Sequence, residues 1–330
     1  ADTSSAVRRR QASCSGGMGR HGLAVAAAGA GVGTLAMLLV ELKRRRQLQK
    51  AAKATSEIAT RICRFQDEAG RVLLGQPCSM EGGRPVEAQL LFVQDLFGDL
   101  LLSDEKVKIT KLLAPLDPLA IVCIGLNYAQ HAKESGMAVP KYPVVFHKTL
   151  TTLQHPFDAI EIPKIESKVD WEVELTVVIG KRCKDVPIDR ALDYVLGYTV
   201  GNDVSGRLWQ LENGGGQWCF GKSFDTFTPL GPLIVTSAVI PDPQNLRVWS
   251  SIDGKIMQDS NTSDMIFSVA QIVAFLSQGT TLLPGTVILT GTPFGVGLGL
   301  KPQRWLKAGE TVTVAADGIG ELTNPVSAAP

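Results

Sequence analysis

A run of alternating acidic and apolar residues in the middle of the chain most constrains how this sequence can fold. Residues 170–179 read DWEVELTVVI, and Gly180 closes the run. Side chains alternate between the two faces of a β-strand, so Glu172 and Glu174 should share one face. A third carboxylate, Asp203, follows a second strand-like run over residues 194–202. From the E-x-E pattern alone, an edge strand with two solvated glutamates is the simpler interpretation.

Burial would change the chemistry of these three carboxylates. Taking ionised carboxylates out of water is costly unless a cation accompanies them. A hard divalent ion such as Mg²⁺ prefers oxygen ligands and would remove that cost. Glu172, Glu174 and Asp203 are therefore candidate metal ligands, provided that the fold brings them together.

Composition excludes several classes of protein. The chain has 330 residues, 45% of them hydrophobic and 20% charged, which is ordinary for a globular protein with one large domain or two. Its net charge of +1 does not suggest binding to nucleic acid. The six cysteines include no C-x-x-C pair, and there are four histidines, so neither a disulfide scaffold nor a zinc site is expected.

The N-terminal part of the sequence differs from the rest. Residues 1–22 are rich in Ser, Arg and Gly and resemble a processed organellar transit peptide. Residues 23–40 carry no charge, which favours a transmembrane helix over 23–42 rather than a buried core helix or a signal peptide. Gly29 and Gly33 form a G-x-x-x-G pair that could contact a helix of another subunit. Residues 43–61 read as a basic helix and linker.

The remaining chain is predicted to be mainly β. Residues 62–118 should form a small β-domain, and residues 119–330 a larger domain. Asp253-Gly254 lies between two strand-like runs and is the strongest hairpin signal in the chain. A helix is expected over residues 267–278, after Asp264.

Two further groups of residues could take part in chemistry. His131 and Glu134 lie three residues apart in a predicted helix, where the carboxylate could hold the imidazole as a general base. For this pair taken alone, an exposed helix with a chance His and Glu is the simpler interpretation. Lys148 ends a strand-like run that could direct it at the carboxylates, and Lys222 could contact an anionic substrate or simply be a surface lysine.

Six motifs in this chain resemble those of one enzyme family. They read GLNYAQHAKE, DWEVELTVVIGK, GNDVSGRLWQ, GKSFDTF, DGKIMQDSNTSDMIF and PGTVILTGTPFGVG. In this order they resemble the fumarylacetoacetate hydrolase family over about residues 62–328, and in particular its mitochondrial branch, which includes oxaloacetate tautomerases. The resemblance implies a mainly β, α+β fold, in which a β-roll or β-sandwich catalytic domain follows the small N-terminal β-domain.

The resemblance also implies roles for individual residues. Glu172, Glu174 and Asp203 would bind Mg²⁺ or Mn²⁺, and His131 with Glu134 would form the catalytic pair. Lys222 would stabilise developing negative charge, whereas Lys148, Arg207, Gln210 and Thr292 would contact a small dicarbonyl acid. Two departures concern the surroundings of the site: Leu208 stands where the family usually has aspartate, and Gly206 where it usually has alanine.

Two functions are compatible with these features. The added apolar segment favours an accessory subunit of a respiratory complex, spanning the mitochondrial inner membrane once with its folded domain in the matrix. The alternative is a free-standing metal-dependent enzyme, which would be an oxaloacetate tautomerase or decarboxylase or an acylpyruvate hydrolase tethered to the membrane. The run over residues 291–299 lacks the Gly-Lys-Ser/Thr of a P-loop, so nucleotide binding there is not expected.

Overall fold

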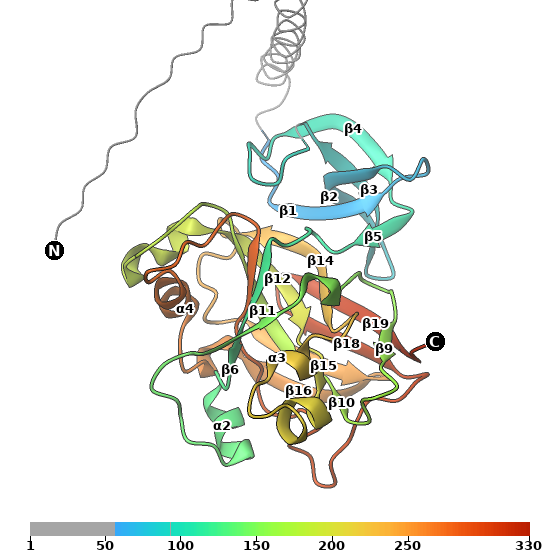
Figure 1. Ribbon diagram of the computed structural model, residues 1–330. Helices are drawn as coiled ribbons and strands as arrows, with labels where there is room; N and C mark the ends of the chain where they lie inside the picture. The colour runs from blue at the N-terminus through green and yellow to red at the C-terminus, as the bar shows by residue number, and fades with distance from the viewer. Residues whose placement is uncertain (1–56, 93) are drawn as a thin grey trace, which may run out of the picture. The chain divides into compact units, whose positions relative to one another are not determined.

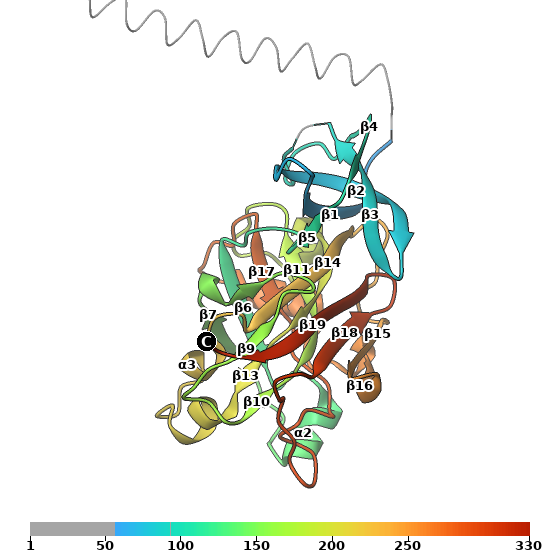
Figure 2. The same ribbon diagram turned by 90° about the vertical axis from the view of Figure 1, so that its right-hand side faces the viewer.

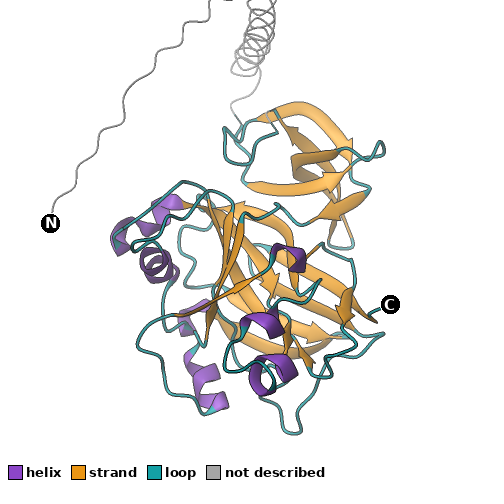
Figure 3. Ribbon diagram, viewed as in Figure 1, coloured by secondary structure: helices purple, strands orange, loops and turns teal. Residues whose placement is uncertain are grey.

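The computed structural model describes residues 57–92 and 94–330, which belong to one compact unit, Thr55–Pro330. Figure 3 shows strands through most of this unit and short helices at its periphery. The mainly β prediction is therefore confirmed. No helix within the described residues is long and apolar enough to cross a bilayer. The predicted span over residues 23–42, with Gly29 and Gly33, lies outside the described part of the chain.

A large mixed sheet runs through the described unit (Figure 1). Its strand order is β4 (Leu102–Lys108), β3 (Arg84–Leu91), β2 (Val72–Glu81), β1 (Arg61–Gln66), β14 (Thr228–Thr236), β12 (Val195–Asn202), β11 (Val173–Ile179), β17 (Thr286–Leu289), β6 (Ala120–Gly125) and β7 (Val144–Lys148). Two short strands attach to this path: β5 (Lys111–Leu113) pairs with β1, and β8 (Leu153–Gln154) pairs with β14. Strands β1 to β4 form a lobe at one end, joined to the rest where β1 pairs with β14.

A second sheet packs beside the first and completes the core. Its order is β16 (Lys255–Asn261), β15 (Arg247–Ile252), β18 (Thr311–Ala316), β19 (Gly320–Ala328) and β9 (Ile160–Ile162), seen side by side in Figure 2. The β15–β16 hairpin turns at Asp253-Gly254, as predicted, with both residues at positive φ (49° and 79°). Positive φ at both central positions is what a type I′ turn requires.

The helices are short and lie at the edges of the sheets. They are α2 (Ala129–Ser135), α3 (Cys219–Lys222) and α4 (Val269–Leu276), with the 3₁₀ turns η1 (Leu150–Thr152), η2 (Ile188–Tyr194) and η4 (Thr262–Asp264) and the π-helical turn η3 (Leu208–Glu212). The predicted helix over residues 267–278 corresponds to α4. It begins after Ser268, whose side chain and that of Gln271 form a capping box.

Strand β11 lies in the core, and every one of its residues is buried. Its apolar side chains are mostly β-branched, which suits a strand buried on both faces. Each such side chain contributes roughly 1.5–3 kcal/mol on burial. The strand is antiparallel to β12, with Val173 opposite Asn202, so Glu174 and Asp203 lie near the same edge of the sheet.

The prediction of one continuous strand over residues 170–179 is wrong in one detail. The chain forms β10 (Val169–Asp170) and then β11, with Trp171 and Glu172 between them. β10 pairs with β13 (Ser205–Gly206), whereas β11 pairs with β12. The backbone therefore changes partner at Glu172, whose N–H donates to the Asn202 side chain at 3.0 Å.

Candidate active site

The structure brings the three predicted metal-binding carboxylates together. Glu172, Glu174 and Asp203 each offer an oxygen, and these oxygens lie within 4.8 Å of one another. All three residues are buried. Glu172 precedes β11, Glu174 lies on it and Asp203 follows β12, so the pairing of two adjacent strands creates the cluster.

Three buried cations surround these carboxylates. The Nζ atom of Lys222 donates to Glu172 at 2.7 Å and to Asp203 at 2.8 Å. Lys148 donates to the other oxygen of Asp203 at 2.5 Å. Arg207 donates from Nη2 to Glu172 at 2.6 Å. Lys222 also lies above the Phe146 ring, 5.1 Å from its centroid.

Glu174 differs from its neighbours because none of these cations forms an ion pair with it. Its hydrogen-bond donor is the backbone N–H of Gly291, at 2.7 Å. Burial, together with the charges of Asp203 and Glu172, raises the pKa of Glu174 well above its ordinary value. Burial would also raise the pKa of Glu172, but Lys222 and Arg207 lower it to about 2. Among these buried groups, negative charge is therefore least compensated at Glu174.

This donor set suits a divalent metal ion. The cluster contains four buried carboxylates, those of Asp170, Glu172, Glu174 and Asp203. It also contains three buried cations, those of Lys148, Arg207 and Lys222. One negative charge is left over, at the carboxylate that has no cationic partner. Oxygen atoms converging in a buried, negatively charged site are the ligands that hard divalent cations prefer.

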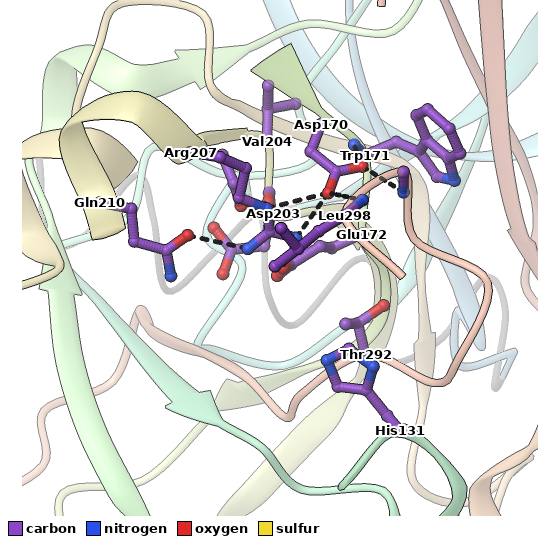
Figure 4. A network of polar contacts seen from close by, with 12 residues as sticks. His131, Asp170, Trp171, Glu172, Asp203, Val204, Arg207, Gln210, Thr292 and Leu298 are labelled. Atoms are coloured by element: carbon purple, nitrogen blue, oxygen red, sulfur yellow. Dashed lines mark hydrogen bonds and ion pairs between the residues drawn. The ribbon is translucent and has the colours of Figure 1, made fainter. Parts of the chain in front are cut away.

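Asp170 is a member of the site that the sequence analysis did not single out. Its Oδ2 atom accepts from Arg207 Nε at 2.9 Å, as Figure 4 shows. Leu208 stands where the family usually has aspartate, next to Arg207. In this structure the buried carboxylate of Asp170, on β10, forms an ion pair with Arg207. The position of Asp170, two residues before Glu172, was the signal available in the sequence.

The glycine-rich run over residues 291–299 contacts the carboxylates through its backbone. The N–H groups of Gly297 and Leu298 donate to Asp170 at 2.7 and 3.0 Å. The N–H of Gly295 donates to Glu134 at 3.2 Å. With the Gly291 bond to Glu174, one segment therefore binds carboxylates from three different elements.

The predicted catalytic pair forms on helix α2. His131 Nδ1 lies 3.1 Å from Glu134 Oε2. The side chains are 12% and 21% exposed, so both are sheltered while solvent still reaches them. Because Glu134 engages Nδ1, the Nε2 atom of His131 remains for a substrate or a water molecule.

A cleft joins these groups. It contains about 520 Å³ of space not filled by protein, including its open mouth. The predicted site residues that line it are His131, Glu172, Glu174, Arg207, Gln210, Lys222 and Thr292. Figure 4 shows His131 beside Thr292, with Gln210 next to Arg207. Gln210 Oε1 accepts from Arg207 Nη1 at 2.8 Å.

Lys148 was predicted to contact substrate, but the structure places it elsewhere. It does not line the cleft. Its side chain is fully buried, and its three ammonium hydrogens serve Asp203 and the carbonyl oxygens of Val204 and Phe227. Lys148 therefore supports Asp203 from behind.

Comparisons with known proteins agree with this architecture. Residues 120–327 match the family defined as fumarylacetoacetate (FAA) hydrolase C-terminal. Putative hydrolases of Burkholderia ambifaria and Burkholderia cenocepacia are 59% identical to this chain over 199 residues, which is 60% of this chain and 70% of theirs.

Solved structures give the same result. A 5-carboxymethyl-2-hydroxymuconate delta-isomerase from Mycobacterium smegmatis superposes with a TM-score of 0.70 at 37% identity, covering 82% of this chain and 100% of that one. A 2-hydroxyhepta-2,4-diene-1,7-dioate isomerase from Mycobacterium marinum gives 0.68 at 38%, covering 82% and 99%. A fumarylacetoacetate hydrolase from Exiguobacterium antarcticum gives 0.71 at 34%, also covering 82% and 99%.

These relatives correct one prediction and identify the family. They contradict the predicted single-pass location in the mitochondrial inner membrane, because the sequence relatives at 59% identity are proteins of bacteria, which have no mitochondria. They give no support to a mitochondrial branch either. The family match and the shared fold nevertheless agree with the six motifs, and the chain belongs to the fumarylacetoacetate hydrolase family.

Proposed function

We propose that this protein is a free-standing, divalent-metal-dependent enzyme that acts on a small 2-oxo acid with a second carbonyl group in the 1,3 position. One observation carries the proposal: the buried carboxylates of Glu172, Glu174 and Asp203 converge, and two of them, Glu172 and Glu174, line the same cleft as His131, which pairs with Glu134. The names of the relatives, hydrolases and isomerases, support an enzyme rather than the accessory subunit that the sequence alone had favoured.

Glu172, Glu174 and Asp203 would hold the ion, with Mg²⁺ or Mn²⁺ as the expected occupant because all three ligands are carboxylate oxygens. When bound, such an ion supplies Lewis-acid polarisation of substrate oxygens. The charge of the surrounding residues is suited to this, since Glu174 lacks a cationic partner of its own.

The residues of the chain supply proton transfer and orientation. His131 accepts a proton at Nε2, from a water molecule or from the carbon between the two carbonyl groups. Glu134 holds Nδ1 and stabilises the imidazolium that forms. Gln210, held through Oε1 by Arg207, keeps its amide hydrogens as donors for the substrate carboxylate. The Thr292 side chain lies beside His131 and lines the same cleft.

The test uses the purified full chain, stripped of metal and then supplied with Mg²⁺ or Mn²⁺. Tautomerisation and decarboxylation of oxaloacetate, and cleavage of 2,4-dioxopentanoate, are followed separately. We expect turnover that requires metal and falls at least about 100-fold in His131→Ala, the size typical of a lost general base. The melting temperature of this variant should match that of the wild type, because the side chain is not in the core. Wild-type rates no higher than those of His131→Ala in every assay would refute the proposal.

A further inference from the structure

One of the six motifs supplies no residue to the cleft. DGKIMQDSNTSDMIF spans residues 253–267, and none of these is among the described residues that line the cleft. The motif forms the second half of the β15–β16 hairpin and the turn η4, at the edge of the second sheet. Its side chains nevertheless contact both parts of the site, the strand of metal-binding carboxylates and the helix that carries His131.

Gln258, on β16, is completely buried, and its side-chain amide forms four hydrogen bonds. Its Oε1 atom accepts from the backbone N–H of Val173 at 3.0 Å and from the Ser250 hydroxyl at 2.9 Å. Its Nε2 atom donates to Thr292 Oγ1 at 2.8 Å and to the Pro293 carbonyl at 2.9 Å. These partners fix the direction of the amide, because a flipped amide would set a donor against the Val173 N–H and an acceptor against the Pro293 carbonyl.

The amide of Gln258 ties the metal-binding strand to the glycine-rich run. Val173, its partner on β11, lies between the proposed metal ligands Glu172 and Glu174. The Thr292 hydroxyl accepts from Gln258 and donates to the Val173 carbonyl at 3.0 Å. Together with the bond from the Val173 N–H, these contacts close a ring of three hydrogen bonds. The ring joins β11 to the run through one side chain of the second sheet.

The run also rests on β16 where it binds the partner of the proposed base. Gln258 donates to the Pro293 carbonyl, and two residues later the N–H of Gly295 donates to Glu134 at 3.2 Å. A Cβ atom at Gly295 would lie 2.2 Å from the Met257 carbonyl oxygen, so the run packs directly on the backbone of β16. The position of the bond to Glu134 therefore depends on this strand.

The other end of the motif holds the start of helix α2. The Asp264 carboxylate accepts from the backbone N–H of Gln130, in the first turn of the helix, at 3.1 Å. Asn127, buried just before the helix, accepts at Oδ1 from the Phe267 N–H at 2.8 Å and donates to the Phe267 carbonyl at 3.0 Å. His131 follows Gln130 directly, so the base is attached to the same motif as the metal-binding strand.

We infer that the motif over residues 253–267 fixes the proposed base relative to the metal-binding carboxylates, and that Gln258 is its main positioning residue. The inference rests on the proposed function, in which base and carboxylates act on one substrate. Gln258 acts through Val173, Thr292 and Pro293 and does not itself line the cleft. The rate should depend steeply on its amide, because a shift of about 1 Å between reacting groups can cost about 100-fold.

Gln258→Met tests this with the full chain, because methionine has a similar length and forms none of the four bonds. With saturating Mg²⁺ and whichever proposed substrate the wild type turns over, we expect kcat to fall about 30-fold and KM to change less than about 3-fold, since a misplaced base affects the transition state more than substrate binding. Gln258→Glu, which keeps both acceptor contacts but sets an oxygen against the Pro293 carbonyl, is the second variant. Ser250→Ala is the matched control: it removes one bond of the same amide but none to β11 or to the run, and kcat should stay within about 2-fold.

The His131→Ala background separates positioning from a general loss of structure. There, Gln258→Met should lower the residual kcat less than about 3-fold, because the base whose position it sets is absent. Hydrogen exchange in the metal-free protein gives a readout that does not need turnover. We expect Gln258→Met to speed amide exchange over residues 291–295 at least about 10-fold and to leave β1 in the N-terminal lobe unchanged.

The outcomes separate this inference from the proposed function. Unchanged exchange over residues 291–295 in both Gln258 variants overturns the assignment, whatever the activity. Turnover by the wild type with kcat nearly unchanged in both variants, or with the full loss repeated in the His131→Ala background, overturns the positioning role and leaves the proposed function standing. Absence of turnover by the wild type counts against the proposed function, and the exchange rates alone then decide whether Gln258 holds the run.

Discussion

Replacing Lys148 with methionine tests whether buried ion pairs hold the active site together. The side chain of Lys148 is fully buried, and that of its partner Asp203 is 1% exposed. The ammonium group donates at 2.5 Å to Asp203, 2.6 Å to the Phe227 carbonyl and 3.2 Å to the Val204 carbonyl. Methionine has a similar length but no donor, so all three acceptors lose this partner.

The size of the effect follows from that burial. Removing one member of a buried ion pair typically costs about 3–5 kcal/mol, because the other charge stays buried without compensation. Lys222 still contacts the second oxygen of Asp203, and the Phe227 carbonyl keeps the backbone N–H of Val204 as a donor, which limits the loss, whereas the Val204 carbonyl loses the donor that Lys148 supplied. We therefore expect Lys148→Met to lower the free energy of unfolding by about 3–5 kcal/mol.

Urea unfolding, monitored by circular dichroism in EDTA, measures this loss. Lys108→Met is the matched control, because Lys108 pairs with Glu68 at 3.3 Å while both side chains are 72% exposed. Exposed pairs contribute about 1 kcal/mol or less, since water and salt screen them. If the two variants lose stability to within 1 kcal/mol of each other, the buried pair does not stabilise the site as argued.

Two further predictions concern carboxylates near the site. Gly206→Ala should cost about 1–3 kcal/mol of unfolding free energy, because its Cβ would lie 2.5 Å from Oε2 of the buried Glu166. Denaturation of Gly206→Ala, Glu166→Ala and the double variant should show a coupling of at least about 0.5 kcal/mol, and strict additivity would exclude the clash. Glu174→Gln should change how stability depends on pH. The folded-state pKa of Glu174 lies above its ordinary value of 4.5, so the metal-free wild type should lose stability relative to this variant as pH rises above 4.5. A constant difference in melting temperature between pH 4 and pH 8 would contradict this reasoning.

Local sequence patterns were sufficient for much of the fold. The run over residues 170–179 predicted a strand, because β-branched side chains of this kind fit a pleated surface, and β11 forms within it. The Asp253-Gly254 turn was predictable because few residue pairs accept positive φ at both positions. His131 and Glu134 met as expected, since residues three apart share a helix face.

Long-range contacts account for what the sequence did not reveal. The change of partner strand at Trp171 and Glu172 depends on the pairing of β10 with β13, more than thirty residues later in the chain. The supporting position of Lys148 depends on the carbonyl groups of Val204 and Phe227, which no local pattern brings to it. In both cases the decisive contact joins residues far apart in the sequence. The alternation of side chains along a single strand does not show which distant residues that strand will meet.

The run over residues 291–299 forms hydrogen bonds to two parts of the site. The catalytic pair lies on α2, and the carboxylate cluster lies at the ends of β11 and β12. The N–H of Gly291 binds Glu174, whereas that of Gly295, four residues on, binds Glu134. Both donors are backbone amides of one segment, so the spacing of the two carboxylates follows the backbone conformation of this segment. The bonds from Gly297 and Leu298 to Asp170 extend the same constraint to Arg207.

The segment that lacked the signature of a phosphate-binding loop thus still binds anions, and these anions are the protein's own carboxylates. A reacting carbon would need the metal-binding carboxylates and the base held in a fixed relation, and hydrogen bonds from this one backbone segment link the two.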